Sequence, residues 1–235
     1  MILSGIQKMS LVDFPGKVAC TVFTGGCDLR CPFCHNAELL TAPTAALTTE
    51  ELLSFLKKRT GLLEGVVVTG GEPCLHKDLP ELLSAIRELG FKTKLDTNGS
   101  FPDLLDVILS RHLIDYAAID IKNAPDRYAM TAGVSSYNME PLKKTLSLLV
   151  ASGIDFELRT TVVHPLHDEA SFTGIRDFLL GLFDGKAVIP HYYLQFFTDR
   201  DTVPFAGLQA PTKEEMKIYA DILSPVSPSV MLRGE

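Results

Sequence analysis

The sequence has 235 residues, of which 46% are hydrophobic and 22% charged, and its formal net charge is -7. This length and composition are typical of a globular protein that can bury a full core within one domain. The acidic balance argues against general binding to nucleic-acid backbones, which basic surfaces perform. No apolar stretch approaches the roughly 18 residues that span a bilayer, and the N-terminus lacks the pattern of a signal peptide. We therefore expect a cytoplasmic protein with neither a nucleic-acid nor a membrane partner.

Short apolar, β-branched runs alternate along the chain with longer amphipathic stretches. We predict strands at 17–23, 65–69, 92–96, 116–121, 156–163 and 187–196, and helices at 48–59, 78–89, 103–110, 139–151 and 169–182. A last helix at 212–223 is expected to pack on the outside, followed by a loose tail at 224–235. The alternation indicates βαβ units and a parallel sheet. Periodicity alone fits either an incomplete barrel of six strands or a doubly wound sheet.

The five cysteines are an odd number and are not dispersed like a disulfide framework. One short loop, which begins with two glycines, holds three of them: Cys27, Cys31 and Cys34. Because closed metal sites usually take four protein ligands, three thiolates would leave one iron of a cubane cluster open. A zinc site also remains possible, with Cys74 or His35 as the fourth ligand. Without the triplet, only Cys20 and Cys74 remain, which are too few for a second cluster.

Six loops of unusual composition follow the predicted strands, at 24–34, 70–73, 96–99, 120–123, 163–167 and 195–200. In parallel α/β folds the active site lies at the C-terminal ends of the strands, so we expect these loops to form one site. The loop 70–73 reads Gly-Gly-Glu-Pro: its glycines expose backbone carbonyls, and Glu72 can accept a hydrogen bond from an ammonium group. In the loop 163–167, His164 and His167 are candidates for contact with a partner.

Two further loops offer charged groups. Asp96 lies in an Asp-Thr-Asn-Gly stretch, which is either an ordinary turn or a source of oxygen ligands. Arg159 lies inside an apolar strand, where its charge must be paired. Its guanidinium could bind a ligand carboxylate in bidentate fashion or pair with a structural acid such as Glu72 or Asp120.

The three-cysteine loop and the Gly-Gly-Glu-Pro loop together resemble the radical S-adenosylmethionine superfamily. The resemblance implies an α/β fold, a partial (βα)6 TIM-like barrel of parallel strands. It also implies a single domain over residues 1–235, with an N-terminal leading segment at 1–16 and a C-terminal helix and tail at 212–235. The three cysteines would hold a [4Fe–4S] cluster whose open iron is chelated by S-adenosylmethionine. Reductive cleavage of that cofactor would give a 5′-deoxyadenosyl radical that abstracts a hydrogen atom.

The same resemblance implies which residues contact the cofactor. The aromatic position before the third cysteine is filled by Phe33, and the Gly-Gly-Glu-Pro loop would hold the amino group of the methionine moiety. Asp96, together with Asp120, would hold a monovalent cation. The full set of implied cofactor contacts is Phe33, Cys34, His35, Gly70, Gly71, Glu72, Pro73, Asp96, Asn98, Ile121, Lys122 and Arg159.

Within the superfamily, the segments 11–17, 26–36, 70–73, 95–99 and 157–161 most resemble the glycyl-radical-enzyme activating family, in particular the activators of anaerobic ribonucleoside-triphosphate reductase. Activators of pyruvate formate-lyase are near relatives, although these have a histidine after the last strand where residues 195–198 have none. The implied substrate is a glycine Cα–H of a large partner enzyme, with a flavodoxin- or ferredoxin-type electron donor. Two alternatives are a radical enzyme acting on a small metabolite, like carboxy-deazaguanine synthase, and a zinc-binding interaction protein.

Overall fold

The computed structural model describes residues 1–41 and 44–234. The chain groups into two compact units. The first unit consists of Met1–Asp28, Glu38–Ala118 and Lys144–Asp155, and the second of Leu29–Ala37, Ile119–Lys143 and Phe156–Glu235. The last residue of the predicted tail, Glu235, lies outside the described residues.

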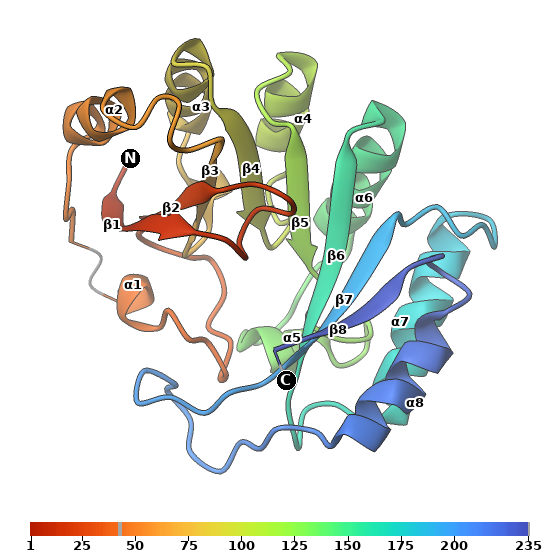
Figure 1. Ribbon diagram of the computed structural model, residues 1–235. Coiled ribbons are helices and arrows are strands. Elements are labelled where there is room, and N and C mark those ends of the chain that lie inside the picture. Colours follow the sequence, from red (N-terminus) through yellow and green to blue (C-terminus); the bar gives the residue numbers. More distant parts are fainter. Residues whose placement is uncertain (42–43, 235) are drawn as a thin grey trace. The chain divides into compact units, whose positions relative to one another are not determined.

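Eight strands form one sheet whose order follows the chain from β1 to β8 (Figure 1). They are β1 (Leu3–Ser10), β2 (Ala19–Thr24), β3 (Gly65–Gly70), β4 (Lys92–Thr97), β5 (Tyr116–Asp120), β6 (Asp155–Val162), β7 (His191–Phe196) and β8 (Val230–Arg233). β1 runs antiparallel to β2, whereas the pairs β2–β3, β3–β4, β6–β7 and β7–β8 are parallel. A doubly wound sheet would reverse its strand order at a switch point. The unbroken order therefore confirms the partial TIM-like arrangement, and in the described residues the sheet stays open, with β1 and β8 as its edges.

The helices follow the predicted alternation. They are α1 (Glu38–Thr41), α2 (Thr49–Lys57), α3 (Leu79–Glu88), α4 (Pro102–Ser110), α5 (Tyr128–Ala132), α6 (Glu140–Ser152), α7 (Glu169–Leu182) and α8 (Lys213–Leu223), with a 3-10 helix η1 (Pro73–Leu75). A capping box begins α2: the Thr48 hydroxyl accepts from Glu51 N, and the Glu51 carboxylate accepts from Thr48 N. In the described residues, every helix is too short or too polar to cross a bilayer.

Two strands and three short helical segments were not predicted. The segment 224–235 was expected to be a loose tail, but it contains β8, which pairs with β7. β1 lies in the segment 1–16, where its alternation is weak because several of its side chains are exposed. The remaining unpredicted elements, α1, α5 and η1, are each five residues or shorter, which is too short for helical periodicity to register.

The segment between β1 and β2 folds back onto the first unit. Phe14 packs in a buried cluster with Ala19, Val67 and Tyr116. A Cβ atom on Gly65 would lie only 2.8 Å from the Phe14 ring, so a glycine at the start of β3 makes room for this aromatic side chain. The segment 11–17 is thereby fixed against the strands that carry the candidate site of this unit.

Candidate active site

Two predicted loops meet through their backbones in the first unit. Gly71 N donates to Thr24 O and Glu72 N donates to Gly26 O, each at 2.8 Å. A Cβ atom on Gly71 would lie 1.9 Å from the Gly26 carbonyl oxygen, so only glycine permits this approach. The structure therefore brings the Gly-Gly-Glu-Pro loop against the residue that precedes Cys27.

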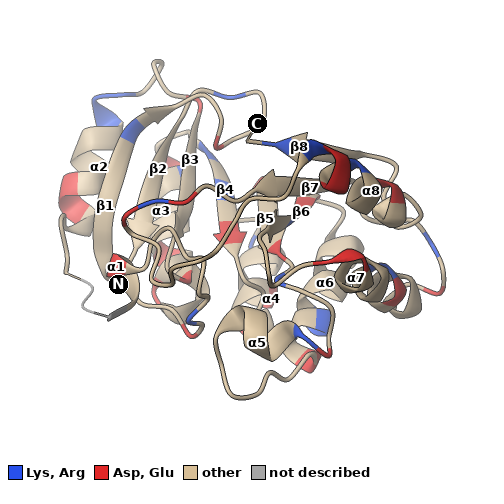
Figure 2. Cartoon of the chain, turned by 90° about the horizontal axis from the view of Figure 1, so that it is seen from below, with Lys and Arg blue, Asp and Glu red and all other residues tan. Residues whose placement is uncertain are grey.

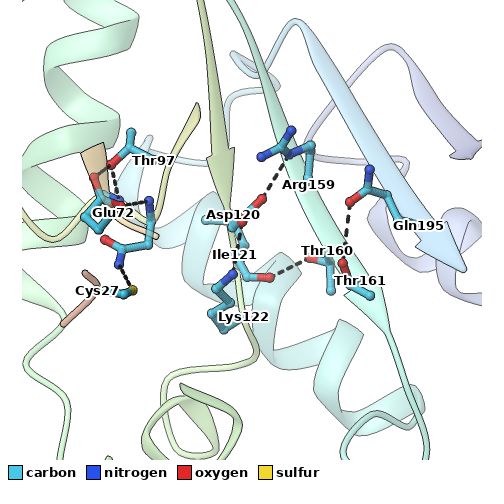
Figure 3. A network of polar contacts seen from close by, with 12 residues as sticks. Cys27, Glu72, Thr97, Asp120, Ile121, Lys122, Arg159, Thr160, Thr161 and Gln195 are labelled. Atoms are coloured by element: carbon cyan, nitrogen blue, oxygen red, sulfur yellow. Dashed lines mark hydrogen bonds and ion pairs between the residues drawn. The ribbon is translucent and has the colours of Figure 1, made fainter. Parts of the chain in front are cut away.

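Glu72 is fully buried and joins its loop to the loop after β4 (Figure 3). Its Oε1 accepts from Cys74 N at 2.8 Å and from the Thr97 hydroxyl at 2.7 Å, and its Oε2 accepts from Asn98 N at 2.7 Å. Burial raises the pKa of the Glu72 carboxyl to about 7, although these three donors act in the opposite direction. Both oxygens thus accept hydrogen bonds from the protein, and this side chain connects the two loops.

Asn98 extends this connection to the cysteine loop. Its side-chain Nδ2 donates to Asp28 Oδ1 at 2.7 Å and lies 3.9 Å from Cys27 Sγ. Its Oδ1 accepts from Ser100 N at 2.9 Å, which closes the turn after β4. The predicted residue Asn98 therefore lies beside the first cysteine of the triplet.

Asp96 lies inside β4, two residues before Asn98, next to a buried lysine. β4 carries both basic and acidic residues (Figure 2), and the Lys94 side chain is only 2% exposed. Lys94 Nζ donates to Asp13 O at 2.5 Å and lies 3.4 Å from Asp96 Oδ1. The charge of Asp96 is therefore already paired within its own unit.

The remaining candidates for a fourth zinc ligand are engaged elsewhere. Cys74 is buried in η1, and desolvation raises the pKa of its thiol well above the usual value. His35 Nε2 lies 2.7 Å from Thr198 O. Cys20 is likewise buried, and desolvation raises the pKa of its thiol to about 12.

The second unit holds the other two cysteines of the triplet. Cys34 N donates to Cys31 O at 3.1 Å, which closes a turn between them. The residue before this turn, Arg30, donates its N–H to Ala132 O at 2.9 Å. The helix α5 ends at Gly133, whose φ is +68° and whose Cβ, if present, would lie 1.9 Å from Arg30 O. The C-terminus of α5 thus supports the backbone of the cysteine loop.

Both thiols of this unit are held mainly in their protonated form. Burial raises the pKa of Cys31 and of Cys34, while the positive charge of Lys122 lowers both. Cys31 is only 7% exposed. Loading of a metal would remove these protons, because the thiolate is the ligand.

Asp120 at the end of β5, Lys122 just after it and Arg159 inside β6 form one charged group (Figure 3). Arg159 Nε lies 2.9 Å from Asp120 Oδ1, and Lys122 Nζ lies 3.0 Å from Asp120 Oδ2. Burial alone would raise the pKa of the Asp120 carboxyl, but the two cations together lower it well below its usual range. Of the structural acids considered for Arg159, Asp120 is the one observed. Because its two oxygens each face a cationic group, Asp120 gives no support to the predicted cation site.

Ile121 contributes its backbone to the same region. Its N–H donates to Arg159 O at 2.8 Å, and its carbonyl oxygen accepts from the Thr160 hydroxyl at 2.8 Å.

Beyond β7, His35 stacks on Phe197 with ring centroids 5.8 Å apart. The residue after the third cysteine is therefore fixed to the loop that follows β7.

The structure corrects one expectation about the histidines. His167 is only 1% exposed, so it is not available for contact with a partner, and that prediction was wrong. His164 is half-buried, with Nε2 at 3.3 Å from Glu215 Oε1. Sequence reasoning also missed Thr97 and Gly133, since a hydroxyl inside a strand and a glycine after a five-residue helix give no distinctive pattern.

The donor set of the cysteine loop fits a thiolate-bound cluster. All five cysteines are free, and three of them lie within eight residues of the sequence. In the described residues, no three His, Cys, Asp or Glu side chains are gathered as a ready-made metal-ion site. Three soft thiolate donors suit iron–sulfur clusters or zinc.

Comparison with known proteins decides between an iron–sulfur cluster and zinc. A sequence model of the Radical SAM superfamily matches residues 21–179, which contain both motif loops. The chain belongs to the radical SAM superfamily. It is therefore an enzyme of a superfamily that uses a [4Fe–4S] cluster and S-adenosylmethionine, and its three free thiols fit that cluster.

The radical SAM chain resembles activating enzymes over most of its length. It is 30% identical, over 99% of this chain and 95% of the relative, to a Methanocaldococcus jannaschii protein named provisionally as a glycyl-radical enzyme activating enzyme. It is 31% identical to the pyruvate formate-lyase-activating enzyme of Clostridium pasteurianum, over 71% of this chain and 70% of that enzyme. These similarities place the chain in the glycyl-radical-enzyme activating family.

Solved structures show the same fold at low sequence identity. The structure of Streptococcus suis SuiB bound to S-adenosylmethionine matches 89% of this radical SAM chain with a TM-score of 0.66 and 16% identity. This chain spans 48% of the matched SuiB chain. The match therefore concerns the fold and not the activity.

Proposed function

We propose that this enzyme activates anaerobic ribonucleoside-triphosphate reductase by removing a hydrogen atom from the Cα of one glycine in that partner. The observation that carries the proposal is the end-to-end similarity to an activating enzyme, at 99% of this chain. By contrast, the similarity to the 7-carboxy-7-deazaguanine synthase of Thermococcus kodakarensis, at 33% identity, covers 42% of this chain. This difference supports a protein substrate over a small metabolite.

The cofactors supply the radical. When bound, the cluster and S-adenosylmethionine would supply reductive one-electron chemistry, by which a 5′-deoxyadenosyl radical could take up the glycine hydrogen. Three cysteines of this chain would ligate the cluster: Cys27, Cys31 and Cys34. A flavodoxin- or ferredoxin-type protein would supply the electron.

The first unit would hold the amino group of the methionine moiety. Gly70 and Gly71 are half-buried and carry no side chain that would cover the loop backbone, so their carbonyl oxygens are the acceptors that we assign to an ammonium group. Glu72 keeps this loop in place through Thr97 and Asn98. Pro73 begins η1 and gives the end of the loop a fixed backbone angle.

The second unit would contribute positive charge. The carboxylate of the methionine moiety would bind Arg159 or Lys122, both of which now pair with Asp120. Phe33 and Ile121 are buried and would shield the radical from water. These assignments rest on residue type and position, with residues 1–235 acting as one domain.

The narrower partner assignment rests on sequence likeness. The segments 11–17 and 157–161 resemble those of activators of anaerobic ribonucleoside-triphosphate reductase. The segment Gln195–Thr198, at the end of β7 and directly after it, lacks the histidine that pyruvate formate-lyase activators have at this place. The first feature supports the reductase as the partner, and the second sets the chain apart from the pyruvate formate-lyase activators.

The test is anaerobic reconstitution with iron and sulfide, then reduction in the presence of S-adenosylmethionine and the reductase. We expect 5′-deoxyadenosine to form and a glycyl doublet to appear in the partner by electron paramagnetic resonance. Cys31→Ala should abolish both the brown colour and the cofactor cleavage, whereas Cys20→Ala, which changes a buried thiol outside the triplet, should retain them.

Each contrary result points to a different alternative. Cofactor cleavage without a doublet would retain the radical chemistry but overturn the reductase assignment, in favour of another partner or a small metabolite. A colourless protein that binds zinc and leaves S-adenosylmethionine intact would overturn the activating function itself.

A further inference from the structure

His167 is a buried histidine whose two ring nitrogens both lie near backbone groups of the second unit. Its Nε2 lies 2.8 Å from Lys122 O, and its Nδ1 lies 3.3 Å from Val163 N and 3.2 Å from Val163 O. A carbonyl oxygen can only accept, so Nε2 must carry the proton that it donates to Lys122 O. In the neutral ring Nδ1 then accepts from Val163 N. One tautomer therefore satisfies both nitrogens.

The ring of His167 also contacts two aromatic side chains. It meets Phe33 with centroids 6.4 Å apart and planes at 69°, an edge-to-face contact. It also lies 6.0 Å from the Phe172 ring of α7. Such aromatic pairs have preferred orientations and contribute about 0.5–1.5 kcal/mol beyond the burial of area. The position of the Phe33 ring is therefore coupled to that of His167.

The two groups that His167 holds both belong to the site. Phe33 lies directly between Pro32 and Cys34, inside the turn that joins the second and third cysteines. Lys122 Nζ pairs with Asp120, which also pairs with Arg159. A displacement of Phe33 or Lys122 would therefore disturb either the cysteine turn or this charged group.

We infer that His167 is a positioning residue, which fixes the turn Cys31–Cys34 through the Phe33 ring and fixes Lys122 through its carbonyl oxygen. The inference rests on the proposed function for its catalytic consequence, because the turn matters only as a cluster site. The geometry itself needs no cofactor: one imidazole bridges the cysteine turn and the end of β5. A purely apolar residue could fill the same space but would leave Lys122 O and Val163 N without this partner.

Two substitutions separate the halves of this bridge. In His167→Gln, the side-chain Nε2 can still donate to Lys122 O, but the edge contact with Phe33 is lost. In His167→Phe, the ring is kept and both hydrogen bonds are lost. His164→Gln is the matched control, because it changes a histidine three residues earlier whose Nε2 faces Glu215.

The first readout uses the cluster-free, reduced protein. The native chain is treated with a thiol-alkylating reagent, and modification of each cysteine is followed by mass spectrometry. We expect the rate at Cys31 to rise about tenfold in both His167 variants and to stay unchanged in His164→Gln. The buried thiols of Cys20 and Cys74 are internal references, since their continued protection shows that the first unit remains folded.

The second readout is the loaded protein, because changes to residues that orient the ligands of a metal typically cost about 10–100-fold in metal affinity. We expect both variants to bind iron at least about tenfold more weakly and to give an altered electron paramagnetic resonance signal of the reduced cluster. Unchanged Cys31 alkylation, iron affinity and spectrum in both variants would overturn the positioning role. If His167→Phe does not fold, His167→Gln alone decides, because it keeps the donor to Lys122 O.

These outcomes are distinct from failure of the proposed function. A wild-type protein that binds no cluster or leaves S-adenosylmethionine uncleaved would refute the function, while the alkylation rates would still report on the bridge. Conversely, a wild-type protein that forms the glycyl doublet together with unaltered His167 variants would refute only the positioning role.

Discussion

Glu72 yields a prediction whose size follows from its surroundings. Burial raises the pKa of its carboxyl from 4.5 to about 7, so between these values the folded chain binds this proton more tightly than the unfolded chain does. The free energy of unfolding therefore falls as the pH rises from 4.5 to 7. At roughly 1.4 kcal/mol per pH unit, this fall amounts to about 3 kcal/mol. The loss of stability is complete once the pH is above 7.

Glu72→Gln removes the titration but also one hydrogen bond. The amide oxygen can still accept from Cys74 N and Thr97 Oγ1, whereas the amide nitrogen would face the Asn98 N–H, at a cost of about 1–3 kcal/mol. The variant should therefore be clearly less stable than the wild type at pH 5. At pH 8 the difference should have narrowed by about 3 kcal/mol, because only the wild type then carries a buried charge.

The assay is urea unfolding of the cluster-free, reduced protein at pH 5, 6, 7 and 8, with the slope of each transition compared as a check on two-state behaviour. Glu50→Gln, at an exposed position in the first turn of α2, is the matched control and should leave the pH profile unchanged. If the difference between wild type and Glu72→Gln stays constant from pH 5 to pH 8, the carboxyl is not desolvated as the structure shows, and the reasoning fails.

Two further predictions concern stability and the cysteine loop. Gly133→Ala should cost about 1–2 kcal/mol for the left-handed residue alone, plus the clash with Arg30 O, and should lower the iron content; Gly153→Ala, with a φ of +70° and no atom within 4 Å of the new Cβ, carries only the first cost. An equal loss in both variants, measured by urea unfolding and iron analysis, would contradict this. Arg233→Met removes the bidentate partner of fully buried Glu157, with contacts of 3.0 and 3.2 Å, and should destabilise by about 3–5 kcal/mol. Much of that loss should return in Arg233→Met/Glu157→Leu, and a single-variant cost below about 1 kcal/mol would refute the pairing.

Local sequence patterns predicted the alternation of strands and helices. Long helices such as α7 show a clear 3.6-residue period, and its predicted bounds, 169–182, agree with the structure. The strand predicted to begin at residue 17 corresponds to β2, which begins at Ala19. The difference arises because the preceding segment turns back to place Phe14 in the core. β8 was missed because four residues with mixed burial carry no periodic signal.

The loops of the site were predicted from composition, but their internal contacts were not. Glycines at 70 and 71 indicated a backbone-exposing turn, and the structure adds that Gly71 lies against Gly26. Glu72 was expected to meet an ammonium group, yet in the structure its oxygens accept from three protein donors. Two of these donors, Thr97 and Asn98, lie 25 and 26 residues away in the chain, and no local pattern records contacts at that separation.

The buried charges show the same limit. A charge inside the strand containing Arg159 required a partner, and two acids were considered for it. The choice of Asp120 depends on the register between β5 and β6, which sequence does not state. The burial of Lys94, by contrast, was not predicted, because a lysine in a strand is ordinarily solvated. In the structure its side chain is 2% exposed.

The composition of the first unit has a consequence for synthesis on the ribosome. Most of this unit is formed by residues between 1 and 118. It also includes Lys144–Asp155, which is the C-terminal part of α6 together with the residues after it. The hydroxyl of Thr145, on that helix, donates to Gly99 O at 2.8 Å, in the loop that follows β4. A nascent chain that has exposed only β1–β5 therefore lacks part of this unit. Pairing of the early strands can begin during translation, but the loop after β4 reaches its final support only when α6 has left the exit tunnel.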